Sequence, residues 1–127
     1  MNIDETRSDP EPRALDPDAL ARLERFGGPK LLREMIALYL ENAPERLDAA
    51  AAGVVSGDPI STENALHSLK SSSAQLGALR LSRLCDEGET IARSGSLSGI
   101  ADIVAAGRAE LAEVQVWLHG IRDARSA

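Results

Sequence analysis

The 127-residue chain is poor in several residue types, and each scarcity narrows its class. A single cysteine cannot form an intramolecular disulfide, which fits a reducing compartment. The chain has one Phe, one Tyr and one Trp, and this shortage of aromatic strand formers argues against an all-β fold. The core must therefore be built from Leu, Ile, Val and Ala, a composition that favours helices. The length fits one domain.

Positive charge and long apolar runs are scarce as well. The 14 Lys and Arg residues are outnumbered by 20 Asp and Glu residues, which gives a net charge of −6 and no dense basic patch. Nucleic acid is therefore not an expected partner. No stretch approaches the roughly 18 apolar residues of a membrane span, and the N-terminus lacks the apolar core of a signal peptide. We expect a cytoplasmic protein without membrane contact.

Chemistry that depends on bound groups has little support in the sequence. No glycine-rich phosphate loop is present, so we expect neither ATP binding nor autophosphorylation. Two histidines and one cysteine without ligand spacing predict no metal site and no cofactor on this chain. A hydrolase that uses a histidine base is not favoured either, because no nucleophile, oxyanion site or cleft-forming loop is evident.

Apolar residues recur at helical spacing in a series of stretches separated by short turns. Residues 1–13 show no such period and are predicted to be a disordered acidic tail, which leaves 14–124 as the domain. A short first helix opens at Asp16-Pro17 and ends at Gly27-Gly28, and longer helices are expected at about 30–55, 61–77, 79–93 and 98–122. Long amphipathic helices with short loops pack antiparallel. The sequence thus predicts an all-α fold, an up-down-up-down four-helix bundle with a short N-terminal capping helix.

The most informative segment is the expected helix at 61–77. Its apolar stripe follows a 3-4-3 spacing, through Leu66, Leu69, Ser73 and Leu76. A second group at helical spacing lies on the opposite side and comprises His67, Lys70, Ser71 and Ala74. We therefore expect an outward imidazole with an ammonium one turn away and small side chains around it. A nucleophile beside a fixed positive charge on an open surface suits a phosphoryl group that must come and go.

This segment resembles the histidine-containing phosphotransfer domain, the carrier module of multistep two-component relays. The motif of that family reads roughly His-x-Leu-Lys-Gly-Ser-x-x-x-x-Gly, and this chain matches it at His67, Leu69, Lys70, Ser72 and Gly77. Ser71 departs from the motif, because the family usually has glycine there. The resemblance extends from about Leu15 to Ile121 and so covers nearly the whole chain.

The resemblance implies a covalent phosphoryl carrier, a histidine phosphotransfer protein without ATP-dependent kinase activity. His67 would accept a phosphoryl group from a phospho-aspartate of a receiver domain and pass it to another receiver, and Lys70 would supply positive charge near that group. Glu89 falls at the offset where relatives carry Glu or Gln facing the histidine, so it would orient the ring. The other interpretation of Glu89 is a solvated surface glutamate. The Ser71 hydroxyl would either contact the phosphoryl group or merely be tolerated.

The expected partners follow from the same resemblance. They are receiver domains of response regulators or of hybrid histidine kinases, which would bind a monomer of this protein. The Mg²⁺ that transfer needs would be held by the receiver. Docking would use apolar residues near the histidine, mainly from the first two helices, and the candidates are Phe26, Ile36 and Leu40, with small Ala74 leaving room.

An alternative function is a non-catalytic docking or antagonist module that binds receiver domains without transfer. Ser71 leaves this alternative open, as does Gly88, which stands where relatives often have a bulky apolar side chain. The retained pair of His67 and Lys70 argues against it.

Overall fold

The structure, a computed structural model, describes residues 14–125. Four helices make up most of this range: α2 (Pro17–Ser56), α3 (Pro59–Gln75), α4 (Leu79–Arg93) and α5 (Ile100–Ala124). Within these residues, extended pairing is limited to an isolated antiparallel bridge between Leu15 and Ala78. The predicted all-α fold is therefore confirmed. The predicted disordered tail, residues 1–13, lies outside the described residues.

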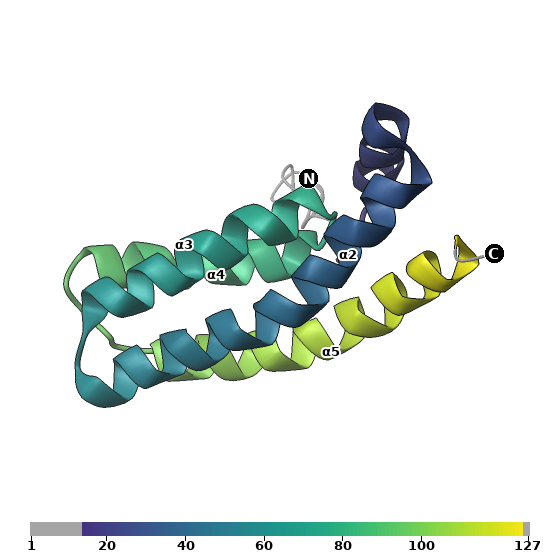
Figure 1. Cartoon of the computed structure of the whole chain (residues 1–127). Coiled ribbons are helices and arrows are strands. Elements are labelled where there is room, and N and C mark those ends of the chain that lie inside the picture. The colour runs from purple at the N-terminus through teal and green to yellow at the C-terminus, as the bar shows by residue number, and fades with distance from the viewer. Residues whose placement is uncertain (1–13, 126–127) are drawn as a thin grey trace, which may run out of the picture.

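The helices form an antiparallel bundle (Figure 1). α2 runs along the bundle in one direction, α3 returns, α4 reverses again and α5 returns a second time, with short turns between them. α3 packs against both α2 and α4, and α5 closes the ring by packing against the same two helices. This is the predicted up-down-up-down arrangement, and it leaves one long face of α3 toward solvent, flanked by α2 and α4.

α2 contains a sharp break at Gly28, whose backbone is not helical (φ 81°, ψ 175°). A positive φ suits glycine, and the following Pro29 has the φ that starts a new helical segment. The residues before the break form the predicted short helix. Its N-cap is Asp16, whose carboxylate accepts a hydrogen bond from the Asp18 N–H at 3.0 Å. This short segment turns away from the direction of the rest of α2 (Figure 1).

Two kinds of contact fasten the short N-terminal segment to one end of the bundle. The Asp16 N–H donates to the Gly77 carbonyl, at the turn between α3 and α4, at 2.8 Å. The Arg125 guanidinium, just after α5, holds the Glu24 carboxylate through two nitrogen–oxygen contacts of 2.8 Å. The segment therefore caps the bundle as predicted, attached both to the α3–α4 turn and to the end of the last helix.

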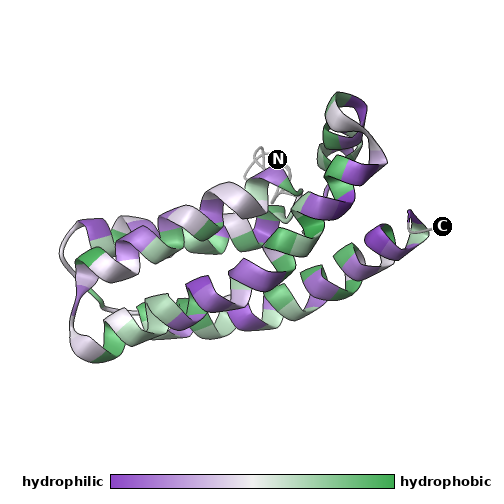
Figure 2. Ribbon diagram, in the orientation of Figure 1, coloured by the Kyte–Doolittle hydropathy of each residue, from purple (hydrophilic) through white to green (hydrophobic). Residues whose placement is uncertain are grey.

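The core is built from aliphatic side chains on the inward faces of all four helices. Figure 2 shows polar and apolar residues interleaved along every helix, as expected when one face is buried. The largest fully buried apolar side chains are Leu32, Ile36, Leu47, Leu66, Leu69, Leu81, Ile100, Val114 and Leu118. Because polar residues interrupt each helix, none in the described range has the length and apolarity that a membrane crossing requires.

Candidate functional site

His67 lies on the solvent-facing side of α3. Asp58 is the N-cap of this helix, and its carboxylate accepts hydrogen bonds from the Ser61 N–H at 3.1 Å and the Ser61 hydroxyl at 2.7 Å. The hydrogen bonds from Ser61 lower the pKa of the Asp58 carboxyl. Leu66 and Leu69, which belong to the apolar stripe of this helix, are fully buried. The His67 side chain, on the opposite side, is 62% exposed. The predicted outward histidine is confirmed by this geometry.

Glu89 lies on α4, and its buried carboxylate contacts the imidazole of His67. Its side chain is 1% exposed, and its Oε2 lies 2.7 Å from Nδ1 of His67. An ionised carboxylate can only accept a hydrogen bond, so Nδ1 carries the proton and Nε2 keeps the ring's lone pair. The interpretation of Glu89 as a solvated surface glutamate is therefore wrong, and the predicted contact with the histidine is present.

Lys70 and His67 keep the buried Glu89 carboxylate ionised. Burial alone would raise its pKa, but the interactions with Lys70 and His67 outweigh burial and hold the pKa below its usual value. Lys70 Nζ lies 2.8 Å from Oε1 as an ion pair, although Oε1 receives no hydrogen bond of good angular geometry. The Arg93 guanidinium contacts Oε2, one turn along α4. Glu89 is thus a fixed negative charge beneath the imidazole.

The charges continue beyond Glu89 along the boundary between α3 and α4. Lys70 Nζ also lies 3.3 Å from Asp86 Oδ1, and Arg93 Nε lies 3.0 Å from Glu63 Oε2. We call the alternating series Asp86, Lys70, Glu89, Arg93 and Glu63 the charge network. Three of its members, Asp86, Arg93 and Glu63, were not predicted from the sequence. One sequence signal was available, because a glutamate followed by an arginine four positions later is a favourable pair on a helix.

The two serines that follow Lys70 have different surroundings. Ser71 is exposed, and no hydrogen bond of its hydroxyl is found among the described residues. Ser72 is half-buried, and its hydroxyl donates to the carbonyls of Ser68 and Leu69, at 3.2 and 3.3 Å, within its own helix. The hydroxyl of Ser71 is therefore available at the surface beside His67, whereas that of Ser72 is occupied by backbone.

Gly77, the glycine of the motif, is required by the backbone of the turn after α3 and does not contact the histidine. Its φ is +82°, and a Cβ there would collide with the carbonyl oxygen of Asp16.

Gly88 stands where relatives often have a bulky apolar side chain, and the structure gives a steric reason for glycine at this position. A Cβ on Gly88 would lie 2.7 Å from Leu66 Cδ1, so glycine permits a close approach of α4 to α3 directly beside His67. That approach places Glu89 within reach of the imidazole.

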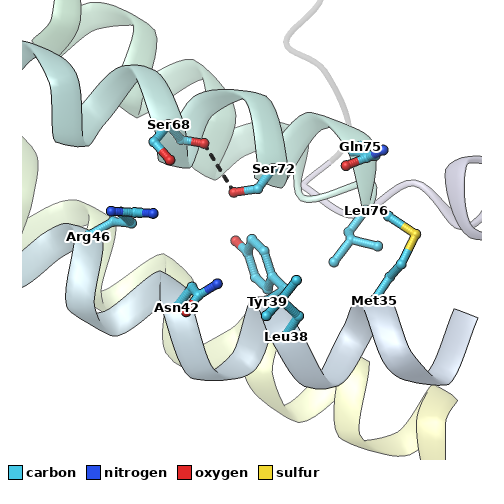
Figure 3. A pocket seen from close by; sticks show the side chains of 9 residues that line it. All are labelled: Met35, Leu38, Tyr39, Asn42, Arg46, Ser68, Ser72, Gln75 and Leu76. Carbon is cyan, nitrogen blue, oxygen red and sulfur yellow. Dashed lines mark hydrogen bonds between the residues drawn. The ribbon is translucent and has the colours of Figure 1, made fainter.

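A small groove lies on the other side of the histidine, between α2 and α3. Its volume is about 120 Å³, and Figure 3 shows its lining: Met35, Leu38, Tyr39, Asn42, Arg46, Ser68, Ser72, Gln75 and Leu76. Ser68, the residue after His67, is among the α3 residues that line the groove. At its base, Tyr39 Oη and the buried Ser73 Oγ are 2.8 Å apart.

The predicted docking residues fall in several places. Ile36 is fully buried in the core, so its assignment to a docking surface is wrong. Leu40 is half-buried against the core, and Ala74 is exposed on α3. Phe26 is 87% exposed on the short N-terminal helix. Leu38, which the sequence analysis did not select, is 58% exposed on the groove.

A metal site on this chain has no support from the side chains that are described. Among residues 14–125, no group of three or more His, Cys, Asp and Glu residues is arranged to hold a metal ion. The Cys85 thiol is buried, and burial raises its pKa to about 12, with the nearby Glu89 charge acting in the same direction.

Together, the fold and the site define a class of protein: a four-helix bundle that presents an accessible histidine, oriented by a buried carboxylate, on one helix face. The family model of the Hpt domain matches residues 34–117. The chain belongs to the Hpt domain family, and it is a phosphorelay carrier of two-component signalling.

Solved structures agree with this assignment. The chain is similar to histidine-containing phosphotransfer protein B from Pseudomonas aeruginosa, with 26% identity and a TM-score of 0.83 over 89% of this chain and 97% of that one. It is also similar in fold to the HPT domain of a sensor hybrid histidine kinase from Shewanella, with 20% identity and a TM-score of 0.75 over 90% of this chain and 97% of that one. No curated protein matches the sequence significantly.

Proposed function

We propose that His67 accepts a phosphoryl group at Nε2 from the phospho-aspartate of one receiver domain and gives it to the aspartate of another. The observation that carries this proposal is the contact of 2.7 Å between Nδ1 and the buried Glu89 carboxylate. It holds the proton on Nδ1 and leaves the lone pair on Nε2, in a side chain that is 62% exposed.

The covalent step needs no proton transfer at the ring. The Nε2 lone pair attacks phosphorus, an N–P bond forms, the P–O bond of the acyl phosphate breaks, and the aspartate carboxylate leaves. The phosphorylated ring keeps its Nδ1 proton and is therefore cationic, so the Glu89 carboxylate stabilises it. The reverse step on a second receiver uses the same atoms, which makes the transfer reversible.

Lys70 supplies positive charge to the phosphoryl group in this proposal. It lies one turn from His67 on the same helix, where side chains at this spacing are neighbours. Its ammonium lies 2.8 Å from Glu89 Oε1 and 3.3 Å from Asp86 Oδ1, and its side chain is 29% exposed. It can therefore reach the surface when a phosphoryl group arrives. The Ser71 hydroxyl has no partner among the described residues and is assigned no essential role.

The receiver domain would dock over the α2–α3 groove and supply the reactive aspartate together with Mg²⁺. Support for this position is the apolar surface of the groove, where exposed Leu38 lies with polar Asn42 and Arg46 on α2, and where the other side is lined by α3, the helix that carries the histidine. The opposite flank carries the charge network, which would be costly to desolvate.

We infer that the protein works as a cytoplasmic monomer.

The test is incubation with a receiver domain that has been phosphorylated on its aspartate with a small acyl-phosphate donor in Mg²⁺. The wild-type chain should acquire phosphate that is labile in acid and stable in base. His67→Gln should acquire none and should keep its melting temperature, because the side chain is exposed. His119→Gln is the matched control, since His119 is exposed on α5 and should leave transfer unchanged.

Two outcomes would reject the proposal. Full phosphorylation of His67→Gln would show that the acceptor is elsewhere. Binding of the receiver without any phosphate on the wild-type chain would favour the docking or antagonist module instead.

A further inference from the structure

Lys70 is shared between two carboxylates that differ in what else they bind. Glu89 is buried and also contacts His67 and Arg93, so it keeps two partners if the ammonium leaves. Asp86 is 60% exposed, and Lys70 is its ion-pair partner in the described part of the chain. The role of Glu89 is accounted for by the histidine. The role of Asp86 is not, because apart from Lys70 its carboxylate contacts neither the imidazole nor a member of the charge network.

We propose that Asp86 is a positioning residue that sets how strongly His67 retains a phosphoryl group, by competing with that group for Lys70. This inference rests on the proposed transfer at His67. A phosphoryl group on Nε2 brings about two negative charges next to Lys70, which then faces three anions: the phosphoryl group, Glu89 and Asp86. The negative charge of Asp86 attracts the ammonium and so opposes its turning toward the phosphoryl group.

The competition is weak enough to tune the equilibrium without preventing transfer. Asp86 is largely hydrated, so water can replace the ammonium when Lys70 turns toward the phosphoryl group. The distance of 3.3 Å from Lys70 Nζ to Asp86 Oδ1 is also longer than the 2.8 Å from Nζ to Glu89 Oε1. Removing an exposed ion-pair partner of this kind corresponds to a change of about two- to fivefold in an equilibrium constant.

The experiment measures the equilibrium constant for phosphoryl exchange between one receiver domain and this chain. Asp86→Asn should raise the ratio of phosphohistidine to phospho-aspartate about two- to fivefold, because the shape is kept and the competing charge is removed. Glu87→Gln is the matched control. It makes the same charge change one residue along α4, at an exposed position beside Ala106 and Glu110 of α5, and should leave the ratio unchanged.

Two further measurements separate competition for Lys70 from other effects. The gain from Asp86→Asn should shrink in about 1 M salt, where charges are screened over about 3 Å. It should also be clearly smaller in a Lys70→Ala background, because the shared ammonium is gone. An equal gain in both backgrounds would show that Asp86 acts without Lys70 and would overturn the inference.

The outcomes also distinguish this inference from the proposed function. If neither the wild-type chain nor Glu87→Gln acquires phosphate on His67, transfer itself is wrong. If both acquire it and Asp86→Asn has the same equilibrium constant as Glu87→Gln, transfer stands and the role given to Asp86 is wrong.

Discussion

The two flanks of α3 surround the same histidine with opposite kinds of surface. On the α4 side, Glu89 is buried and ionised and is held by cations in a fixed network. On the α2 side, a groove of mostly neutral side chains carries the exposed Leu38. Fixed charges orient a nucleophile and stabilise the charge that develops during the reaction. Burial of an apolar surface against a partner instead contributes binding free energy. In the proposed function, chemistry and recognition are separated across one helix, and variants should therefore separate the transfer rate from the affinity for the receiver.

The largest effect should come from removing the carboxylate on the α4 side. Glu89→Ala takes away the acceptor of the Nδ1–H hydrogen bond, so we expect the rate of phosphoryl uptake at saturating receiver to fall about ten- to a hundredfold. Glu89→Gln keeps an acceptor oxygen and should lie between this variant and the wild type. Rapid-quench kinetics give the rate, and ¹⁵N shifts of the ring report which nitrogen is protonated. An unchanged ratio of the ring tautomers would contradict the orienting role.

A change on the α2 side should do the opposite: it should weaken binding of the receiver and leave the rate of phosphoryl uptake at saturating receiver unchanged. Leu38→Asp places a charge on the groove, and losing the burial of one leucine should weaken receiver binding about tenfold or more. Val116→Asp is the matched control, because Val116 is an exposed apolar residue on α5, away from the groove. Titration calorimetry gives the affinity. Equal losses for both variants would remove the groove from the docking surface.

The fixed charge of Glu89 should also be visible in stability against pH. Its pKa lies below the ordinary value of 4.5 in the folded state, so its ionised form stabilises the fold above about pH 4.5. This contribution is lost as the pH falls through the lowered pKa. The difference in free energy of unfolding between wild type and Glu89→Gln should therefore narrow from about pH 6 to pH 3. Denaturant titrations measure it, and a constant difference would be evidence against an ionised Glu89.

The close approach of α4 to α3 can be tested with Gly88→Ala. The added methyl would lie 2.7 Å from Leu66 Cδ1, and relieving this overlap moves the residue next to His67. Overpacking should outweigh the better helix propensity of alanine and leave a net loss of about 1 kcal/mol, with transfer slowed severalfold. Gly120→Ala is the control, because nothing lies within 4 Å of the new Cβ. It should gain up to about 1 kcal/mol.

The smallest effect is expected at Ser71. Its hydroxyl has no hydrogen bond among the described residues, so Ser71→Gly should change the transfer rate by less than about twofold. Glycine in a helix should lower the free energy of unfolding by about 0.5 kcal/mol. A large loss of transfer with a normal melting temperature would show instead that the hydroxyl contacts the phosphoryl group.

The fold could be predicted almost completely from local patterns. The stripe of Leu66, Leu69 and Ser73 fixes which side of α3 is buried, and Gly28 before Pro29 fixes the break in α2. These features depend on one helix at a time. The assignment of Ile36 to docking failed for a related reason, because Ile36 belongs to the buried stripe of α2, and Leu38 faces the groove.

The site could be predicted only in part. His67 and Lys70 share one helix, so their spacing shows that they are neighbours. The contacts of Glu63 with Arg93 and of Lys70 with Asp86 cross from α3 to α4. They depend on how far each helix is rotated about its axis and on the close approach at Gly88, and neither quantity can be read from the periodicity of a single helix.

The attachment of the N-terminal segment couples local opening at distant points of the chain. The Asp16 N–H binds the Gly77 carbonyl, and the Leu79 N–H binds the Ala14 carbonyl. Detaching the segment would break both bonds together, so the amide hydrogens of Asp16 and Leu79 should exchange with solvent in one cooperative event. A segment that would otherwise fray first is in this way linked to the turn that ends the histidine-bearing helix.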